Sequence, residues 1–509
     1  MITRRSLLGA GALALPLAAA HALPAVATAA ETRRRRWSGL SDRLHGRLVL
    51  PGDPAYGTAK QIGQTRFDSV EPAAVAYCAD EAEIALCLRY AQDRAVPIAV
   101  RSGGHSAAGY STGTGLVVDV SRLNGVAVGA GSVTLGTGAQ LVDVTNGLAP
   151  YGLAVSGGFC PTVALGGFLQ GGGIGLLTRH VGVSSDTVTA ARVVLADGRT
   201  VTASADRHED LYWAIRGGGG GNFGVVTSYT VAPTALTALA VGTLAWGPER
   251  AVAVLDAWAH WLVDAPRTIG GAAVVVLGDA APGQPPTVSV LLSSVGTEAE
   301  LTAQTDRLVD LVGSAPLARG GFGGPYHVVM NGLYGCGTLT HEQCHRAGTG
   351  PAAALPRPAY AVERSRLFPA PPARRMWEDA VALLDRERVP GQQHLIQVGA
   401  LGGAANDLPR TATAYVHRDA LFSTSFLGVI AAGPADGAAT GAARRWTDAG
   451  FAVLDPHSNG ETYQNFVDPE LRNWAASYYA ENYPRLVAAK YRYDPYRLFR
   501  FPQAIGGRG

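Results

Sequence analysis

The sequence predicts an α+β protein whose chain divides into two domains near residue 235. From residue 37 to about 235, short apolar strand patterns, turns and one helical pattern alternate. After Pro233, longer strand patterns alternate with amphipathic helices, which is typical of a sheet covered by helices. The chain has 509 residues, enough for more than one buried core. Its 65 glycines are about 13% of the residues against a usual ~7%, which indicates many close backbone turns.

The first thirty residues predict an export signal rather than a membrane span. They combine an arginine pair, an apolar run and small-residue sites that end at Ala27 or Ala29. The stretch TRRSLL, residues 3–8, resembles a twin-arginine signal, and an ordinary Sec leader is the alternative. No later segment has the roughly eighteen uninterrupted apolar residues of a spanning helix. We therefore expect a secreted, extracytoplasmic protein without stable membrane association.

The charge of the chain gives no reason to expect nucleic acid as a partner. The formal net charge is +2, and the basic cluster Arg33 to Arg36 is too short to form a binding surface. The sequence leaves the oligomeric state open.

Five cysteines are present, so at least one thiol lies outside intramolecular disulfides. Cys336 and Cys344 could form a disulfide in an oxidising compartment, whereas the pairing of Cys78 with Cys87 stays open. Cys344 lies among two histidines in the stretch HEQCH, residues 341–345. We interpret this stretch as a polar loop rather than a zinc site, because no fourth ligand is apparent, and expect no metal.

In the first domain, residues 74–105 predict a strand, a helix that begins near Asp80, a second strand and a turn. Further strands are expected at residues 115–120, 125–138 and 190–203. The last of these carries a hairpin signal at Asp197-Gly198.

In the second domain, strands are expected at residues 238–246, 268–278 and 286–296, and helices at residues 248–263 and 298–313. Residues 315–375 are rich in Gly, Pro and Ala and are expected to be largely loops. Strands resume at residues 394–404 and 413–433.

Three glycine-dense stretches stand apart in the first domain: residues 101–110, 156–182 and 216–231. The third contains Gly219-x-Gly221-x-x-Gly224, a formal match to a dinucleotide fingerprint. We reject this match because a fingerprint loop must open a helix, whereas an alternating strand pattern follows here at residues 225–231. Because glycine lets backbone N–H groups approach a ligand closely, the three stretches together still favour a long phosphorylated ligand.

Three motifs carry a resemblance to a known family. RSGGHS (residues 101–106), GFCPTV (158–163) and the tail YQNFVDPEL…FPQAI (463–505) resemble the berberine-bridge-enzyme-like flavoproteins of the vanillyl-alcohol-oxidase type, over nearly the whole mature chain. The resemblance implies an α+β fold with a two-subdomain FAD-binding domain, residues 31–235, after a signal peptide, residues 1–30. It further implies a substrate domain, residues 236–460, with an antiparallel sheet covered by helices, and a C-terminal segment, residues 461–509, that returns to the FAD-binding domain.

The same resemblance assigns the cofactor and its attachment. FAD is expected to be bonded through its 8α carbon to His105 and through its C6 atom to Cys160. A neutral imidazole and a thiolate are side-chain nucleophiles suited to this, whereas a turn histidine and a buried structural thiol are the alternatives. Further cofactor contacts are expected at Arg101, Ser102, Gly103, Gly104, Ser106, Gly166, Gly167, Asn222, Val226 and Asn465.

The activity implied is that of an FAD-dependent oxidase. A hydride would pass from an alcohol or hemiacetal carbon of a glycoside or natural product to bicovalent FAD and then to O₂, giving H₂O₂. Tyr463, in ETYQNF, is the expected base, although nothing in the sequence shows what would lower the pKa of its phenol from about 10. Val163 falls at the position of an oxygen gatekeeper. Ile174 departs from the family, since many sugar-oxidising relatives have an aromatic residue there, and leaves open oxidative cyclisation or dehydrogenation of a polyketide or alkaloid.

Overall fold

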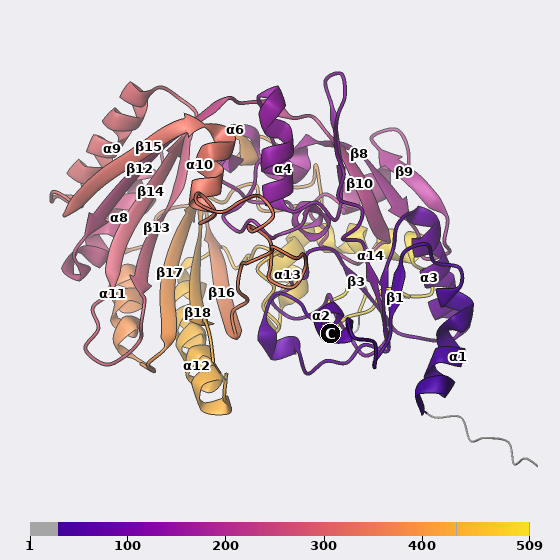
Figure 1. The fold of residues 1–509 in the computed structure, drawn as a ribbon. Coiled ribbons are helices and arrows are strands. Elements are labelled where there is room, and N and C mark those ends of the chain that lie inside the picture. The colour runs from indigo at the N-terminus through magenta and orange to yellow at the C-terminus, as the bar shows by residue number, and fades with distance from the viewer. Residues whose placement is uncertain (1–28, 434, 508–509) are drawn as a thin grey trace, which may run out of the picture. The chain divides into compact units, whose positions relative to one another are not determined.

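The computed structural model describes residues 29–433 and 435–507, so the expected export signal lies almost entirely outside the described residues (Figure 1). Residues 1–39 form one unit, which contributes most of helix α1 (Ala29–Ser41). Residues 40–509 form a second unit, which holds the other described elements. Of the helices in the described ranges, none combines the length and the apolar character needed to span a bilayer.

The first glycine loop follows a four-stranded sheet with the order β1-β2-β4-β3. Its strands are β1 (Arg47–Val49), β2 (Ala74–Tyr77), β3 (Ile98–Arg101) and β4 (Leu116–Asp119). Helix α3 (Glu81–Asp93) connects β2 to β3, and the Asp80 side chain accepts a hydrogen bond from the Glu83 N–H at 2.9 Å. The predicted helix start is therefore confirmed. Because β3 ends at Arg101, residues 102–107 leave the carboxyl end of a strand.

A five-stranded antiparallel sheet with the order β5-β6-β10-β8-β9 supports the other two glycine stretches. Its strands are β5 (Val126–Val128), β6 (Val133–Gly136), β8 (Val188–Val194), β9 (Thr200–Ser204) and β10 (Val225–Val231). The expected β8–β9 hairpin is confirmed, and so is the strand β10 after Gly224. The helices that contact this five-stranded sheet are α4 (Leu141–Leu148), α5 (Leu165–Gln170) and α7 (Glu209–Ala214).

A seven-stranded antiparallel sheet, with the order β15-β12-β14-β13-β17-β18-β16, forms the rest of the molecule. Its strands are β12 (Ala238–Trp246), β13 (Ile269–Leu277), β14 (Thr287–Ser294), β15 (Ala318–Pro325), β16 (Tyr360–Phe368), β17 (Gln392–Ala400) and β18 (Phe422–Ile430). One face is covered by α8 (Ala251–Trp261), α9 (Glu298–Val312), α11 (Arg374–Ala382) and α12 (Gly437–Leu454), as Figure 1 shows. Trp258, Trp261, Trp377 and Trp446 are buried between these helices and the sheet, so the opposite face is free to line a cavity.

Two expectations for this sheet were wrong in part. Residues 315–375 hold β15, α10 (Tyr326–Leu333) and β16 besides loops. β15 carries four glycines in ARGGFGGP, a composition that disfavours strands, but it pairs with β12 along its whole length at the sheet edge. Of residues 413–433, only Phe422–Ile430 is a strand.

The C-terminal helices are α13 (Trp474–Tyr479) and α14 (Tyr483–Tyr493), and α14 packs on α7. The buried Lys490 ammonium donates to the Asp494 carboxylate at 2.7 Å and to the Asn222 carbonyl at 2.6 Å. The Asn222 Oδ1 atom accepts from the Ile505 N–H at 3.0 Å. Helix α14 and Ile505 are thus bonded to the third glycine stretch.

The remaining short helices and strands are α2 (Tyr56–Ala59), α6 (Thr178–Val181), β7 (Leu153–Ala154) and β11 (Thr234–Ala235).

Candidate active site

A cavity of ≈ 900 Å³ lies where the three glycine stretches meet the open face of the seven-stranded sheet. Segments far apart in the sequence form its wall: the loop after β3, the loop before α5, the turn at residues 219–222 and the tail at residues 463–467 and 499–503. Most of the residues expected to bind the cofactor line it, namely Ser102, Gly103, Gly104, His105, Ser106, Cys160, Gly166, Gly167, Asn222, Val226 and Asn465.

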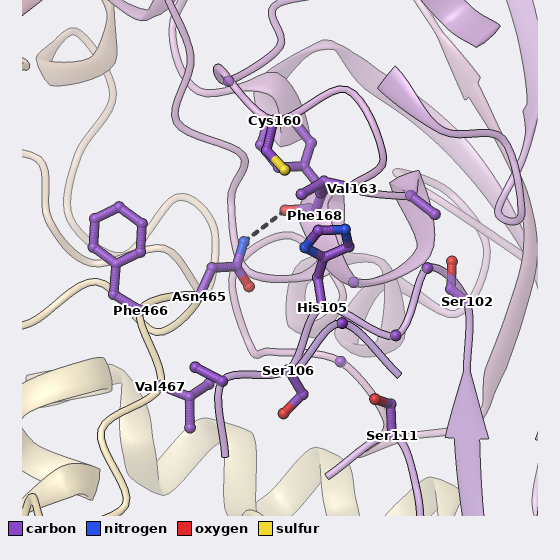
Figure 2. A pocket seen from close by; sticks show the side chains of 18 of the residues that line it. Ser102, His105, Ser106, Ser111, Cys160, Val163, Phe168, Asn465, Phe466 and Val467 are labelled. Carbon is purple, nitrogen blue, oxygen red and sulfur yellow. Dashed lines mark hydrogen bonds between the residues drawn. The ribbon is translucent and has the colours of Figure 1, made fainter. Parts of the chain in front are cut away.

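His105 and Cys160 come together at one hydroxyl group. The His105 Nε2 atom lies 2.8 Å from Thr162 Oγ1, and the Cys160 sulfur lies 3.8 Å from the same oxygen. Figure 2 shows the imidazole and the sulfur on the same side of the cavity, although they come from different loops. Two potential nucleophiles are therefore positioned to reach one ligand.

The surroundings of these two side chains decide their charge. Desolvation by the surrounding protein atoms and repulsion by the Arg346 guanidinium lower the pKa of His105 to about 4, although its side chain is exposed to the cavity. The imidazole is therefore neutral at physiological pH and keeps a free lone pair. Desolvation by neighbouring protein atoms raises the pKa of the Cys160 thiol above its ordinary value, although the side chain is exposed to the cavity, while hydrogen bonds from Thr162 and Val163 act in the opposite direction.

Glycine is required where the two loops approach each other. A Cβ atom on Gly103 would lie 2.8 Å from the Ala164 nitrogen and 3.0 Å from the Thr162 carbonyl oxygen. Gly104 has φ +73°, a conformation that strains other residues. This close approach brings the His105 loop against the Cys160 loop.

Arg101 is the expected cofactor contact that does not line the cavity. Its guanidinium is buried and donates to the Asp119 carboxylate at 2.5 Å and to the Ala59 carbonyl at 2.7 Å. These bonds connect β3 to β4 and to α2. The structure therefore assigns Arg101 to holding the base of the loop rather than to the cavity.

Tyr463 lies in the same wall, and its phenol oxygen accepts three hydrogen bonds. The Gly173 and Ile174 N–H groups donate at 2.9 and 3.1 Å, and the Asn465 amide donates at 2.8 Å. The Asn465 Nδ2 atom also donates to the Phe168 carbonyl at 2.9 Å, as the dashed line in Figure 2 shows. Because Tyr463 is only 2% exposed, burial raises its pKa to about 12, although all three hydrogen bonds act to lower it.

Glu363 of β16 lines the cavity, although no motif in the sequence indicates it. The registers of β16, β17 and β18 put Glu363 beside Leu427, and Gln397 beside Ser425, on the face of the sheet that lines the cavity. Among the described residues of the cavity wall, Glu363 is the only carboxylic acid. Burial raises its pKa to about 7, against a hydrogen bond from Ser425. The alternation of YAVERSRLF could have indicated a strand, but nothing local indicated which face meets a ligand.

Val163 and Ile174 also line the cavity. Ile174 is partly buried against Tyr463, and its backbone N–H rather than its side chain contacts the phenol. Phe159 and Phe466 add aromatic surface to the wall. The region around Tyr463 therefore has a substantial apolar character.

Comparisons with known proteins identify the family of this chain. An FAD binding domain model matches residues 72–204, and a berberine and berberine-like model matches residues 462–506. FAD-linked oxidoreductase dpmaF of Metarhizium anisopliae is 30% identical over 478 residues, which cover 90% of this chain and 88% of that protein. The chain belongs to the berberine-bridge-enzyme-like FAD-linked oxidoreductases. It is accordingly an FAD-linked oxidoreductase that acts on small molecules.

Solved structures show the same fold. Chitooligosaccharide oxidase aligns with a TM-score of 0.80 at 22% identity, covering 93% of this chain and 100% of that one. Berberine bridge enzyme from Eschscholzia californica aligns with a TM-score of 0.81 at 20% identity, covering 94% of this chain and 99% of that one. The predicted α+β fold of an FAD-binding part and a helix-covered antiparallel sheet is confirmed.

The residues of this FAD-linked oxidoreductase fit its cofactor. Gly167 faces open space, where a Cβ atom would meet nothing within 4 Å. Three buried polar atoms of cavity-lining residues have no hydrogen-bond partner: Ser111 Oγ, Gln170 Oε1 and Gln503 Oε1. Such atoms are costly unless a ligand satisfies them, and FAD offers donors and acceptors along its whole length.

Proposed function

We propose that this FAD-linked oxidoreductase is a secreted oxidase. It would remove a hydride from an alcohol or hemiacetal carbon of a glycoside or natural product and pass the electrons to O₂, giving H₂O₂. The observation that carries the proposal is the meeting of His105, Cys160 and Tyr463 in the wall of one cavity. Bound FAD supplies the hydride acceptor and the reaction with O₂. Secretion rests on the resemblance of residues 3–8 to a twin-arginine signal.

The proposal includes two covalent bonds to FAD, one from His105 and one from Cys160. Both side chains contact the Thr162 hydroxyl, so one ring system can reach both. The low pKa of His105, about 4, keeps its lone pair available, and the nearby Arg346 charge contributes to this. A cofactor held by two bonds stays in place beneath a cavity wide enough for a bulky substrate.

The attachment is tested by acid denaturation of the purified protein. The yellow chromophore should stay with the precipitate of the wild type and of each single variant, His105→Ala and Cys160→Ala, and leave only the double variant. Cys87→Ala, at a buried thiol outside the cavity wall, is the matched control and should behave as the wild type. Release of the chromophore from the wild type would show that neither bond exists.

Tyr463 is the proposed acceptor of the proton from the substrate hydroxyl. A neutral phenol oxygen has two lone pairs, whereas three N–H groups point at the Tyr463 oxygen, an arrangement that matches a phenolate. With a pKa of about 12, however, only about 1 in 10⁵ molecules carries the phenolate at neutral pH. Tyr463 therefore needs a group to which its own proton can pass.

We assign that role to Glu363. Its pKa of about 7 leaves it half ionised near neutral pH. As the only carboxylic acid among the described residues of the cavity wall, it would accept the Tyr463 proton through intervening water or substrate. The pH dependence worked out in the Discussion tests this assignment.

The cavity wall bears on the substrate class. Glu363, Gln397 and Ser425 present hydrogen-bonding groups from the sheet, which suits the hydroxyl groups of a glycoside. Ile174, Phe159 and Phe466 present apolar surface, which favours the second candidate, oxidative cyclisation or dehydrogenation of a polyketide or alkaloid. The name of the structurally similar chitooligosaccharide oxidase supports the first candidate, oxidation of a glycoside.

An anaerobic screen distinguishes the two candidates. Bleaching of the flavin absorbance would be followed with sugars, glycosides, alkaloids and aromatic polyketides. Product analysis of the compounds that bleach the flavin then separates a carbonyl product from a new ring. Admission of O₂ should restore the colour and yield one H₂O₂ per product, and absence of H₂O₂ would overturn the oxidase assignment.

A further inference from the structure

A cluster of two histidines and one aspartate lies beside the FAD cavity, but its three residues are not among those that line it. His341 and His345 belong to the loop between α10 and β16, which the Cys336–Cys344 disulfide closes. Asp143 lies in the first turn of α4, 202 residues before His345. One ligand atom from each of the three lies within 4.8 Å of the others. Only the fold brings Asp143 to the two histidines, so the sequence alone predicted a polar loop at residues 341–345 rather than a metal site.

The spacing within the cluster is that of metal ligands. The Asp143 Oδ1 atom lies 2.9 Å from His345 Nε2 and 3.1 Å from His341 Nε2. Ligand atoms about 2.0–2.1 Å from a tetrahedral zinc ion are about 3.3 Å apart. Each nitrogen therefore needs to move only a few tenths of an ångström away from the carboxylate oxygen to share an edge of such a site with it, and all three ligand atoms lie within 4.8 Å of one another. His341 is 51% exposed, so the fourth vertex is open to a water molecule.

Neighbouring groups orient the ligand atoms. The His345 Nδ1 atom lies 2.9 Å from the His341 carbonyl oxygen and donates its proton there, so that Nε2 faces the carboxylate. Asp143 Oδ2 accepts from the Gln140 N–H at 2.8 Å, which leaves Oδ1 for the histidines. The Asn146 Nδ2 atom donates to His341 Nδ1 at 3.0 Å, so metal binding through His341 Nε2 requires the Asn146 amide to turn over and accept from Nδ1–H instead. A lone pair on His345 Nε2 that faces a carboxylate oxygen requires a positive species between them, either a second proton or a metal ion.

We propose that Asp143, His341 and His345 bind one divalent transition-metal ion, with zinc as the best match to two imidazoles, one carboxylate and one water. Such a ligand set is typical of tetrahedral zinc sites that have three protein ligands and a fourth position open to water. The ion fastens the disulfide-closed loop to α4. Arg346 follows His345 directly, donates to the Ile62 carbonyl at 3.1 Å and lines the FAD cavity. Metal binding therefore holds one wall of the cavity in place without taking part in the chemistry.

The test uses full-length holoprotein, stripped with a chelator and titrated with Zn²⁺ in a calorimeter. One Zn²⁺ per chain should bind the wild type and raise its Tm. His341→Ala and His345→Ala should weaken binding by more than about 100-fold, because even the loss of groups around the ligands costs about 10- to 100-fold. Because His341 is half exposed, its variant keeps the fold, which flavin content and Tm without metal would verify.

His260→Ala is the matched control, because it removes an exposed histidine that also faces a carboxylate, Asp256, on the distant helix α8. This variant should bind Zn²⁺ as the wild type does. Absence of saturable binding to the wild type, or equal binding by the His341→Ala variant, would overturn the proposal. The cluster would then be a proton-bridged group of hydrogen bonds.

Discussion

Replacement of Glu363 by glutamine tests the proton path directly, because the change removes the charge and keeps the size of the side chain. With a pKa of about 7, Glu363 is about 1% ionised at about pH 5 and about 90% ionised at about pH 8. If the carboxylate accepts the proton, the rate of flavin reduction in the wild type should rise about 90-fold over this interval. In the Glu363→Gln variant the rate should be low and nearly independent of pH.

The assay is anaerobic stopped-flow reduction with the best substrate of the screen, at several pH values from about 5 to about 9. The Tyr463→Phe variant is the comparison, since it keeps Glu363 but lacks the phenol through which Glu363 acts, and its slower reaction should lose the inflection near pH 7. An unchanged inflection in Glu363→Gln would refute the assignment of Glu363 as the final proton acceptor.

The same substitution has a second readout that needs no substrate. Because the folded pKa of Glu363 is raised above its ordinary value, the folded state favours the protonated carboxyl. This contribution to stability is fully present below the unfolded pKa and is lost as the pH rises through about 7. The Tm of the Glu363→Gln variant relative to the wild type should therefore increase from about pH 5 to about pH 8.

Four further predictions concern residues of the cavity wall and the disulfide. Tyr463→Phe should slow flavin reduction by about 10²- to 10⁴-fold at constant flavin content, the usual range for a lost proton-transfer group. Val163→Leu should slow the return of flavin colour when O₂ is admitted to the reduced protein, with flavin reduction unchanged, because the larger side chain fills space in the cavity. Gly103→Ala should lower both the flavin content and the Tm, since its Cβ would lie 2.8 Å from the Ala164 nitrogen. The double variant Cys336→Ser, Cys344→Ser should lose about 2.5 kcal/mol of unfolding free energy, measured by denaturant titration, because the disulfide closes a loop with a sequence separation of 8.

Local patterns in the sequence were sufficient for several elements. The Asp197-Gly198 turn predicted the β8–β9 hairpin, and the alternation after Gly224 predicted a strand where the glycine motif alone would have suggested a helix. These elements are specified by residues next to each other in the chain. β15 is not, because its glycines become a strand only through pairing with β12.

The residues of the candidate site likewise include some that local motifs predict and others that only the tertiary structure reveals. The motifs around His105 and Cys160 pointed to two residues that the structure places on one hydroxyl group. Arg101 belongs to the first motif but does not line the cavity, because its guanidinium is paired with the buried Asp119 carboxylate on β4. Glu363 and Asp143 have no motif, and only tertiary packing gives them their neighbours. Side-chain direction, unlike composition, cannot be taken from a sequence pattern.

The bonds between the C-terminal tail and Asn222 have a consequence for biosynthesis. Phe499, Phe501 and Gln503 line the same cavity as Ser102, so residues far apart in the chain must all have left the ribosome before that wall can form. A nascent chain therefore cannot complete the FAD cavity until residues 499–503 have been synthesised.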